Sequence, residues 1–453
     1  MPIIGSTMPI PEFPPSRRQL GLWTTTSLVV GNMVGAGFFL LPAALASFGG
    51  ISLLGWLLSG TGAMLLAFVF SRLSRLLPGV DGGPYAYTRK GFGDFAGFLV
   101  AWGYWISCWT SNAAITVSLV GSLSSFFPVL ARNPILAVLT GLSAIWILTW
   151  VNTLRIKASG MVQLISTILK LLPLVAISIA GFFFMHWNHF IPFNRSGTSS
   201  FNAILGSGAL TLFAFLGVEC ATIPAGNILK PEKTIAQATV IGTVFTTLIY
   251  LLGTMSVMGI LSPPELERSV TPLADAAVTI WGAHARYWMA AGVALASLGA
   301  LNGWILIQGQ IAYAIAKDKL FPSVFEKINK NFVPATGTII SSILVSVLMV
   351  MNFTKGLVEQ FKFMILLSTL TVLVPYIFTT AAYVIIRMKN ETLTASRWIQ
   401  TLVPASLAFI FSLLAVVGAG PSTVFWGFVL LLAGIPVYVW VIWKSKTNPS
   451  SRT

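Results

Sequence analysis

Long apolar runs separated by short polar segments make up almost the whole chain. Each run holds about 20 residues or more, the length that a helix needs to cross the hydrocarbon core of a bilayer. No polar segment is long enough for a separate soluble domain. The pattern therefore predicts one all-α membrane domain over 1–453 with twelve transmembrane helices. The twelve runs lie near residues 22–47, 51–77, 95–127, 134–152, 158–185, 201–226, 235–260, 287–315, 335–353, 361–386, 400–418 and 422–443.

Two of these runs contain residues that break a helix halfway through the membrane. The first run holds GNMVGAGFFLLP at 31–42, with three glycines and a closing proline, and the sixth holds TLFAFLGVECATIP at 211–224. In lipid, the N–H and C=O groups freed by a break must line a cavity inside the protein. Interrupted helices at corresponding places in two halves are typical of secondary transporters built from inverted repeats. The sequence thus predicts a transporter with its substrate at the breaks.

The composition supports a membrane location. The chain is 56% hydrophobic and 9% charged, far below the roughly 25% charged residues of an average soluble domain. Of its 27 lysines and arginines, twenty fall in segments that are cytoplasmic when the N-terminus is inside, and six fall in outer loops. This asymmetry predicts that both termini are cytoplasmic. The net charge of +15 then reflects topology and contact with anionic lipid, and we expect no nucleic-acid binding.

The sequence predicts neither a metal site nor a cofactor. Both cysteines, Cys108 and Cys220, fall inside predicted spans, which argues against a disulfide framework or a zinc site. His186 and His189 share an outer loop, where a solvated pair is the simpler interpretation. An enzyme would need nucleophiles, metal ligands or paired carboxylates in one place, and a channel would need a continuous pore. We therefore expect neither an enzyme nor a channel.

Two ionisable residues remain inside the predicted spans. Lys170 lies in the fifth span, and Glu219 directly follows the break of the sixth. Burying such a group costs about 2.5–3.5 kcal/mol on insertion scales, so it normally faces a partner or an aqueous cavity. Lys170 lies too deep for easy snorkelling, and we interpret it as a fixed cation in the place of a coupling sodium ion. Glu219 either caps N–H groups of the broken helix or carries a proton during transport.

Six strings carry a resemblance to a known family: GNMVGAGFFLLPAALASFGG, GPYAYTRKGFG, YWISCWTSN, TLFAFLGVE, LGALNGWILIQGQ and STLTVLVPY. Together they resemble the amino acid–polyamine–organocation superfamily, and within it the basic amino acid and polyamine antiporters of the arginine/agmatine type. The similarity covers nearly the whole chain. It implies a LeuT-like fold in a bacterial cytoplasmic membrane. In that fold two inverted repeats, at about 22–185 and about 201–386, are followed by two extra helices at about 400–443.

The resemblance also implies how an amino acid would bind at the breaks. Its carboxylate would meet backbone N–H groups around Ala36 and Gly37, where the helix dipole adds positive potential. Its α-amino group would meet free carbonyls near Phe213, Ala214 and Leu216. The sequence departs from the arginine type at three positions, with Ala36 in place of a serine, Phe213 in place of a tryptophan and Ser107 in place of an alanine.

Further roles follow from the same resemblance. The substrate side chain would lie against Trp304, with Cys108, Asn112 and Ser368 as polar contacts. Tyr104 would close the outer side, and the inner gate would comprise Phe213, Glu219 and Tyr376. Each role has a structural alternative: Trp304 and Tyr104 could be packing residues, while Asn112 and Ser368 could be ordinary hydrogen-bonding groups between membrane helices.

We therefore expect a sodium-independent amino-acid exchanger or proton-coupled permease, with arginine/agmatine antiport as the leading form. The alternatives are ornithine/putrescine exchange, lysine/cadaverine exchange and a neutral amino-acid permease. A doubly charged amine should favour more than one buried carboxylate, and Glu219 is the only acid within the predicted spans. The expected partners are an amino acid or its decarboxylated amine and membrane lipids. The sequence leaves open whether the chain forms a homodimer.

Overall fold

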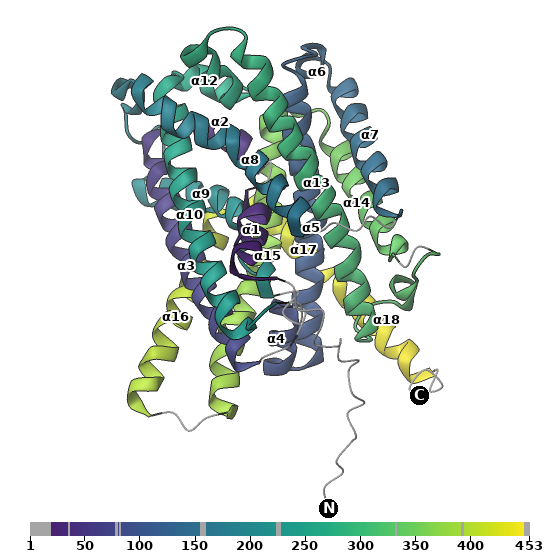
Figure 1. Ribbon diagram of the computed structural model, residues 1–453. Helices are drawn as coiled ribbons and strands as arrows, with labels where there is room; N and C mark the ends of the chain where they lie inside the picture. Colours follow the sequence, from purple (N-terminus) through teal and green to yellow (C-terminus); the bar gives the residue numbers. More distant parts are fainter. Residues whose placement is uncertain are drawn as a thin grey trace, which may run out of the picture.

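The computed structural model of the chain describes residues 20–34, 37–77, 80, 83–154, 160–222, 228–330, 333–390 and 394–447. Within these ranges the fold is all-helical, as expected, and the only strand-like contact is an isolated bridge between Leu20 and Ile228. Long helices run from one end of the bundle to the other, and short helices lie at both ends (Figure 1).

The elements of the first half are α1 (Leu22–Met33), α2 (Gly37–Leu45), η2 (Gly49–Ile51), α3 (Ser52–Leu76), α4 (Pro84–Phe92), α5 (Asp94–Leu123), α6 (Val129–Arg132), α7 (Pro134–Asn152), α8 (Gly160–Ala180), η3 (Gly181–Phe184) and η4 (Trp187–Phe190). Those of the second half are α9 (Ser200–Leu212), η5 (Phe213–Phe215), η6 (Cys220–Thr222), α10 (Pro231–Ile260), α11 (Pro263–Arg268), α12 (Pro272–Trp281), α13 (Ala285–Lys317), η8 (Ser323–Glu326), α14 (Ala335–Asn352), α15 (Leu357–Asn390), α16 (Ala395–Gly418), α17 (Pro421–Leu432) and α18 (Gly434–Thr447).

The helices are long and apolar enough for a multi-pass membrane protein. In the described ranges, ten helices could cross a membrane, and the bent pair of α1 and α2 makes an eleventh. The run expected at 158–185 corresponds to α8 and η3, and its apolar helical part is described over Lys170–Phe184. The number twelve and the inverted-repeat arrangement stay predictions.

The core of the bundle forms around α5. This helix is almost completely buried and packs against α13 and α15, while α1 packs against α8 and α10. Helices at the periphery turn large apolar side chains outward, among them Ile147 of α7, Val417 of α16 and Phe425 of α17. Lipid tails are as apolar as these side chains, so such outward faces are stable in a membrane.

Both expected helix breaks are present. The first span bends by 42° between α1 and α2. In the sixth span, α9 ends at Leu212 and a three-ten turn follows. Leu216 is then extended (φ −61°, ψ 129°), and Gly217 has a φ of +107°. Side chains rarely adopt that backbone conformation, so Gly217 is the residue that permits this break.

The two breaks touch each other. A Cβ atom placed on Gly217 would lie 3.0 Å from Cβ of Asn32 and 3.4 Å from the backbone nitrogen of Met33, at the end of α1. The absence of a side chain at Gly217 therefore allows the broken sixth span to approach the broken first span. This contact places the irregular backbone of both halves at one point in the centre of the bundle.

Candidate functional site

A small cavity lies beside the two helix breaks. Its wall brings together four residues expected at the substrate site, three from the second break and one from α13. The lining residues are Asn32, Met33, Ser111, Ile115, Phe213, Ala214, Leu216 and Trp304. Irregular backbone and an indole ring thus face one space, which is the arrangement expected for a transporter site at broken helices.

This central cavity is small. It encloses about 20 Å³, which is room for about one water molecule. Phe213 and Trp304 on its wall are both almost fully buried, and Phe213 packs edge-on against Phe361 of α15 with ring centroids 6.3 Å apart. An amino acid can occupy this place only after the walls have moved apart.

Glu219 is completely buried just after the second break, and two tyrosines bind its carboxylate. Tyr104 of α5 donates to Oε1 at 2.8 Å, and Tyr376 of α15 donates to Oε2 at 2.9 Å. Glu219 therefore joins α5 to α15. Tyr104, expected on the outer side of the site, and Tyr376, expected in the inner gate, therefore bind the same carboxylate.

The two cysteines lie near this acid. Cys108 and Cys220 are buried, unpaired, and within electrostatic range of Glu219. Cys108, expected to contact the substrate, is not on the wall of the central cavity. No group of three metal-ligating side chains occurs in the described part of the chain. His186 and His189 lie together in their loop, with ring centroids 5.4 Å apart.

Side chains from two other helices bind the last carbonyls of α1. Lys170 of α8 is buried, and its Nζ donates to the carbonyl of Gly31 at 3.3 Å. Tyr250 of α10 donates to the carbonyl of Met33 at 2.7 Å. The last carbonyls of a helix have no partner within the helix, so these contacts stabilise the end of α1 at the break. The role of Lys170 as a fixed cation stays a prediction.

Ser368 of α15 lies one hydrogen bond behind the cavity wall. Its Oγ is 2.7 Å from Oγ of Ser111, which lines the cavity, and it donates to the carbonyl of Ser107 at 3.0 Å. The Oγ atoms of Ser107 and Ser368 are also 3.0 Å apart. The serine that departs from the family pattern at position 107 thus extends a polar cluster between α5 and α15.

Asn112 is held by another helix. Its Nδ2 donates to Oε1 of Gln308 on α13 at 2.8 Å, and Asn112 is not on the cavity wall. Gln308 in turn donates through Nε2 to Oγ of Ser342 at 3.1 Å and to the carbonyl of Thr338 at 3.4 Å. The Nδ2 group of Asn112 therefore forms a hydrogen bond between helices, which is the structural alternative to a substrate contact.

The remaining expected contacts lie at the start of α2. Gly37 is the first residue of this helix, and Ala36 lies outside the described residues.

Sequence reasoning missed Asn32, Ser111 and Gln308. Asn32 belongs to the GNMVGAG string and was available as a polar residue at a break. Ser111 and Gln308 are polar residues in apolar spans, but nothing in the sequence indicates which helices they face.

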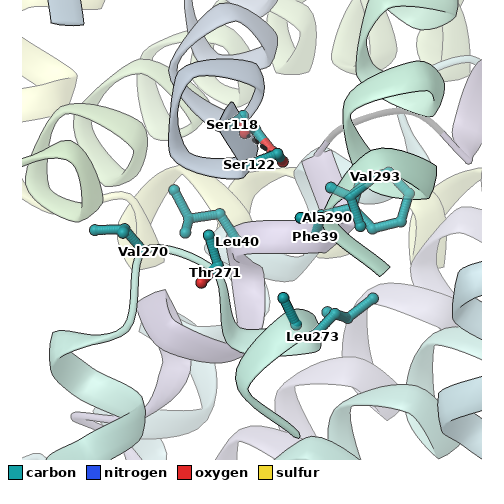
Figure 2. Close-up of a pocket in the computed structure, with 10 residues that line it drawn as sticks. Phe39, Leu40, Ser118, Ser122, Val270, Thr271, Leu273, Ala290 and Val293 are labelled. Carbon is teal, nitrogen blue, oxygen red and sulfur yellow. Dashed lines mark hydrogen bonds between the residues drawn. The ribbon is translucent and has the colours of Figure 1, made fainter. Parts of the chain in front are cut away.

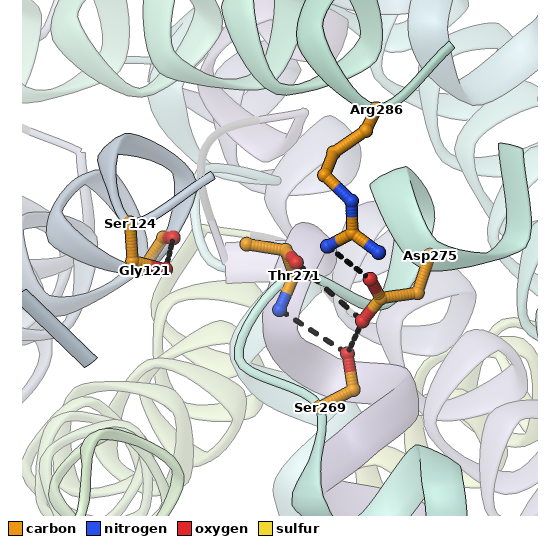
Figure 3. Close-up of polar contacts among 6 residues, drawn as sticks. All are labelled: Gly121, Ser124, Ser269, Thr271, Asp275 and Arg286. Carbon is orange, nitrogen blue, oxygen red and sulfur yellow. Dashed lines mark hydrogen bonds and ion pairs between the residues drawn. The ribbon is translucent and has the colours of Figure 1, made fainter. Parts of the chain in front are cut away.

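On the side predicted to face outward, the segment between α11 and α12 closes the bundle. Gly121 of α5 permits the carbonyl oxygen of Val270 to come close, because a Cβ at Gly121 would lie 2.7 Å from it. Beside this contact, Nη1 of Arg286 pairs with Oδ1 of Asp275 at 2.8 Å, and Ser269 donates to Oδ2 (Figure 3). An ion pair and a backbone contact thus fasten this segment to α5 and α13.

A second small cavity lies next to this segment, between α2, α5 and α13 (Figure 2). Leu40 of α2 and Ser122 of α5 line it together with Thr271 and Leu273. It encloses about 10 Å³, which is too little for a ligand larger than water. Its lining includes none of the residues expected at the substrate site, so we assign it no binding role.

A polar network closes the opposite end, where α4 lies. Arg89 of α4 pairs with Asp94 of α5 at 2.7 Å and with Asp318, at the end of α13, at 3.3 Å. Tyr85 of α4 also donates to Asp318. These contacts tie α4, α5 and α13 together. The central cavity therefore lies between two polar networks, one at each end of the bundle.

Comparison with known proteins gives one consistent result. The arginine/ornithine antiporter of Pseudomonas aeruginosa is 34% identical over 83% of this chain and 81% of its own length. The cadaverine/lysine antiporter of Escherichia coli K12 is 32% identical over 89% and 90%, and the arginine/agmatine antiporter of Chlamydia pneumoniae is 29% identical over 94% and 90%. Residues 20–442 match the family described as amino acid permease. The chain thus belongs to the amino acid permease family.

Proposed function

We propose that this protein is a secondary active transporter that exchanges amino acids, or an amino acid and its amine, across the bacterial inner membrane without sodium. The observation that carries the proposal is the small central cavity beside two helix breaks that touch at Asn32 and Gly217. Such a site admits an amino acid only when its walls move. It therefore suits a carrier that alternates between the two sides of the membrane.

The substrate carboxylate binds at the start of α2, where the helix N-terminus supplies N–H groups and positive potential. The α-amino group binds at the irregular backbone of Ala214 and Leu216, both on the cavity wall. The side chain extends along the ring of Trp304, which can cover an aliphatic stem or a cation. Polar residues of α5 bind the remaining parts of the substrate.

The arrangement behind this function is a LeuT-like one. Two inverted repeats at about 22–185 and about 201–386 each contribute one broken helix, and two extra helices follow at about 400–443. Both termini lie in the cytoplasm, as the distribution of lysine and arginine indicates. The contact between Gly217 and Asn32 supports a pairing of equivalent breaks from the two repeats.

Basic amino acids are the substrates that we favour. The three relatives described above are antiporters named for arginine, ornithine, agmatine, cadaverine and lysine. A neutral amino acid is the second candidate, because the lining residues of the central cavity include no carboxylate. Arginine/ornithine, lysine/cadaverine and arginine/agmatine exchange all remain within the proposal.

Counterflow in proteoliposomes tests the proposal. Vesicles preloaded with unlabelled arginine, ornithine, lysine, agmatine, cadaverine, putrescine or alanine are diluted into buffer with the same labelled compound. We expect labelled substrate to accumulate only when a basic amino acid or its amine is present inside. Uptake that does not saturate would instead indicate a channel, and saturable uptake that does not depend on the internal compound would indicate a proton-coupled permease.

We expect transport to be unaffected when potassium or choline replaces sodium. The ammonium group of Lys170 lies at the end of α1, 3.3 Å from the carbonyl oxygen of Gly31. At an effective dielectric constant of about 20, two unit charges 4 Å apart repel by about 4 kcal/mol, enough to exclude a second cation. Counterflow in the three salts measures this. Lys170→Ala should reduce turnover, and a steep dependence of the wild type on sodium would contradict the role of Lys170.

Trp304→Ala should weaken binding of arginine more than binding of alanine. A desolvated cation–π contact is worth about 2 kcal/mol, which corresponds to roughly a 30-fold change in affinity. Equilibrium binding of both amino acids to purified protein measures the difference. Trp288→Ala is the matched control, because Trp288 lies on the same helix and half exposed, away from the cavity. Equal losses for both amino acids would make Trp304 a packing residue.

A further inference from the structure

We infer that Gln308 is a specificity-determining residue, because it fixes the amide of Asn112 so that the oxygen of that amide is available to the substrate. The inference rests on the proposed function. An unpaired acceptor beside the cavity wall selects side chains that end in N–H donors, such as a guanidinium or an ammonium group, once the walls have moved apart. It disfavours side chains of the same shape that end in an oxygen acceptor.

The orientation of both amides follows from one backbone group. The carbonyl of Thr338 can only accept a hydrogen bond, and it lies 3.4 Å from Nε2 of Gln308. The NH₂ group of Gln308 must therefore point toward α14, and its Oε1 must point toward α5. Asn112 then presents its own NH₂ group to that oxygen, at 2.8 Å. The atom of Asn112 that remains is Oδ1, an acceptor.

The Oδ1 atom is a buried acceptor that lacks a donor. Asn112 is completely buried, and among the described residues no donor lies within hydrogen-bond distance of its Oδ1. A buried acceptor without a partner destabilises the state that contains it. A substrate that brings an N–H group removes this penalty, whereas a substrate that brings another acceptor adds to it.

Helix periodicity places this pair next to residues that line the central cavity, directly behind its wall. Trp304 lines the cavity, and Gln308 follows it by four residues, so both lie on one face of α13. On α5, the cavity-lining residues Ser111 and Ile115 are also four apart, and Asn112 lies between them, three residues before Ile115. The pair thus bridges the two helices that form this part of the wall.

The far end of the chain of hydrogen bonds is anchored outside the substrate site. Oγ of Ser342, which accepts from Gln308 at 3.1 Å, is 2.7 Å from Oγ1 of Thr149 on α7. Both α7 and α14 lie at the periphery of the bundle, where neither lines the central cavity. The orientation of the Asn112 amide is therefore set by the scaffold before any substrate binds.

Arginine and citrulline test this inference, because citrulline carries an oxygen where arginine carries an NH₂ group. Competition binding to purified protein gives the ratio of their affinities. We expect the wild type to prefer arginine. In Gln308→Leu the amide of Asn112 is free to turn, so citrulline should bind more tightly than it does to the wild type. The arginine/citrulline ratio should then fall by about tenfold or more.

Asn302→Leu is the matched control. Asn302 is another amide on α13, and its Oδ1 accepts from Nδ2 of Asn152 at 2.8 Å, away from Asn112. We expect this variant to leave the ratio unchanged. A gain in citrulline affinity is the decisive result, because a variant that only loosens the bundle weakens both ligands together.

Several outcomes would overturn the inference. One is a Gln308→Leu protein in which both affinities fall equally or neither changes. If that variant does not fold, Gln308→Met provides the same comparison with an unbranched side chain. A wild type that exchanges basic amino acids but binds citrulline as tightly as arginine rejects the inference alone. A wild type that exchanges no amino acid rejects the proposed function and the inference together.

Discussion

Gly217→Val should weaken substrate binding by roughly 5- to 150-fold while the protein still inserts into the membrane. Gly217 has a φ of +107°, a conformation that a β-branched residue adopts only under strain of about 1–3 kcal/mol. Its new Cβ would also lie 3.0 Å from Cβ of Asn32, so the two breaks would be pushed apart. Strain of this size corresponds to roughly a 5- to 150-fold loss of affinity. Binding of labelled substrate to purified protein measures it.

Gly303→Val provides the matched control for this substitution. Gly303 precedes the cavity residue Trp304 on α13, and a Cβ at Gly303 would meet no atom within 4 Å. We expect Gly303→Val to retain affinity within a few-fold, so that the contrast isolates the helix break. If Gly217→Val binds substrate as tightly as the wild type does, the sixth span is not part of the substrate site.

Glu219→Gln should slow exchange strongly and flatten its dependence on pH, while substrate still binds. Glutamine has the same shape and can keep contacts to Tyr104 and Tyr376, but it cannot take up or release a proton. Exchange rates across a pH series, with binding measured in parallel, separate the two effects. Glu359→Gln is the control, since Glu359 is an exposed acid at the start of α15.

An unchanged pH profile in Glu219→Gln would reduce Glu219 to a cap for the broken helix. The tyrosines then provide a second measurement. Each hydrogen bond to a charged group contributes about 1.5–3 kcal/mol. Tyr104→Phe and Tyr376→Phe should therefore each lower the thermal stability of the purified protein, whichever role the acid has.

The sequence was sufficient to locate the helix breaks. Glycine and proline act on the backbone of their own segment, so Gly217 and its neighbours could be recognised without knowledge of the fold. The resemblance to a known family, and not the glycine and proline pattern, pointed to Phe213, Ala214 and Leu216, which line the central cavity. An all-helical membrane protein also followed from the length and spacing of the apolar runs alone.

Contacts between helices could not be predicted in the same way. Tyr104 shares an acid with Tyr376, and Asn112 binds Gln308, although each pair comes from distant parts of the chain. The rotation of a membrane helix about its axis is set by packing against its neighbours. A periodic apolar pattern does not specify that rotation when the helix is buried on nearly all sides, as α5 is. Such partners therefore required the structure.

The small central cavity has a consequence for coupling between the two directions of transport. A carrier that returned empty would run down the gradient that an exchanger uses, so its unloaded return must be slow. The small cavity of about 20 Å³ carries a void penalty of only about 0.5 kcal/mol, which hardly slows that step. The unpaired Oδ1 of Asn112 carries about 1–3 kcal/mol. In the proposed exchanger, a slow unloaded return would thus depend on an unsatisfied polar atom more than on empty space.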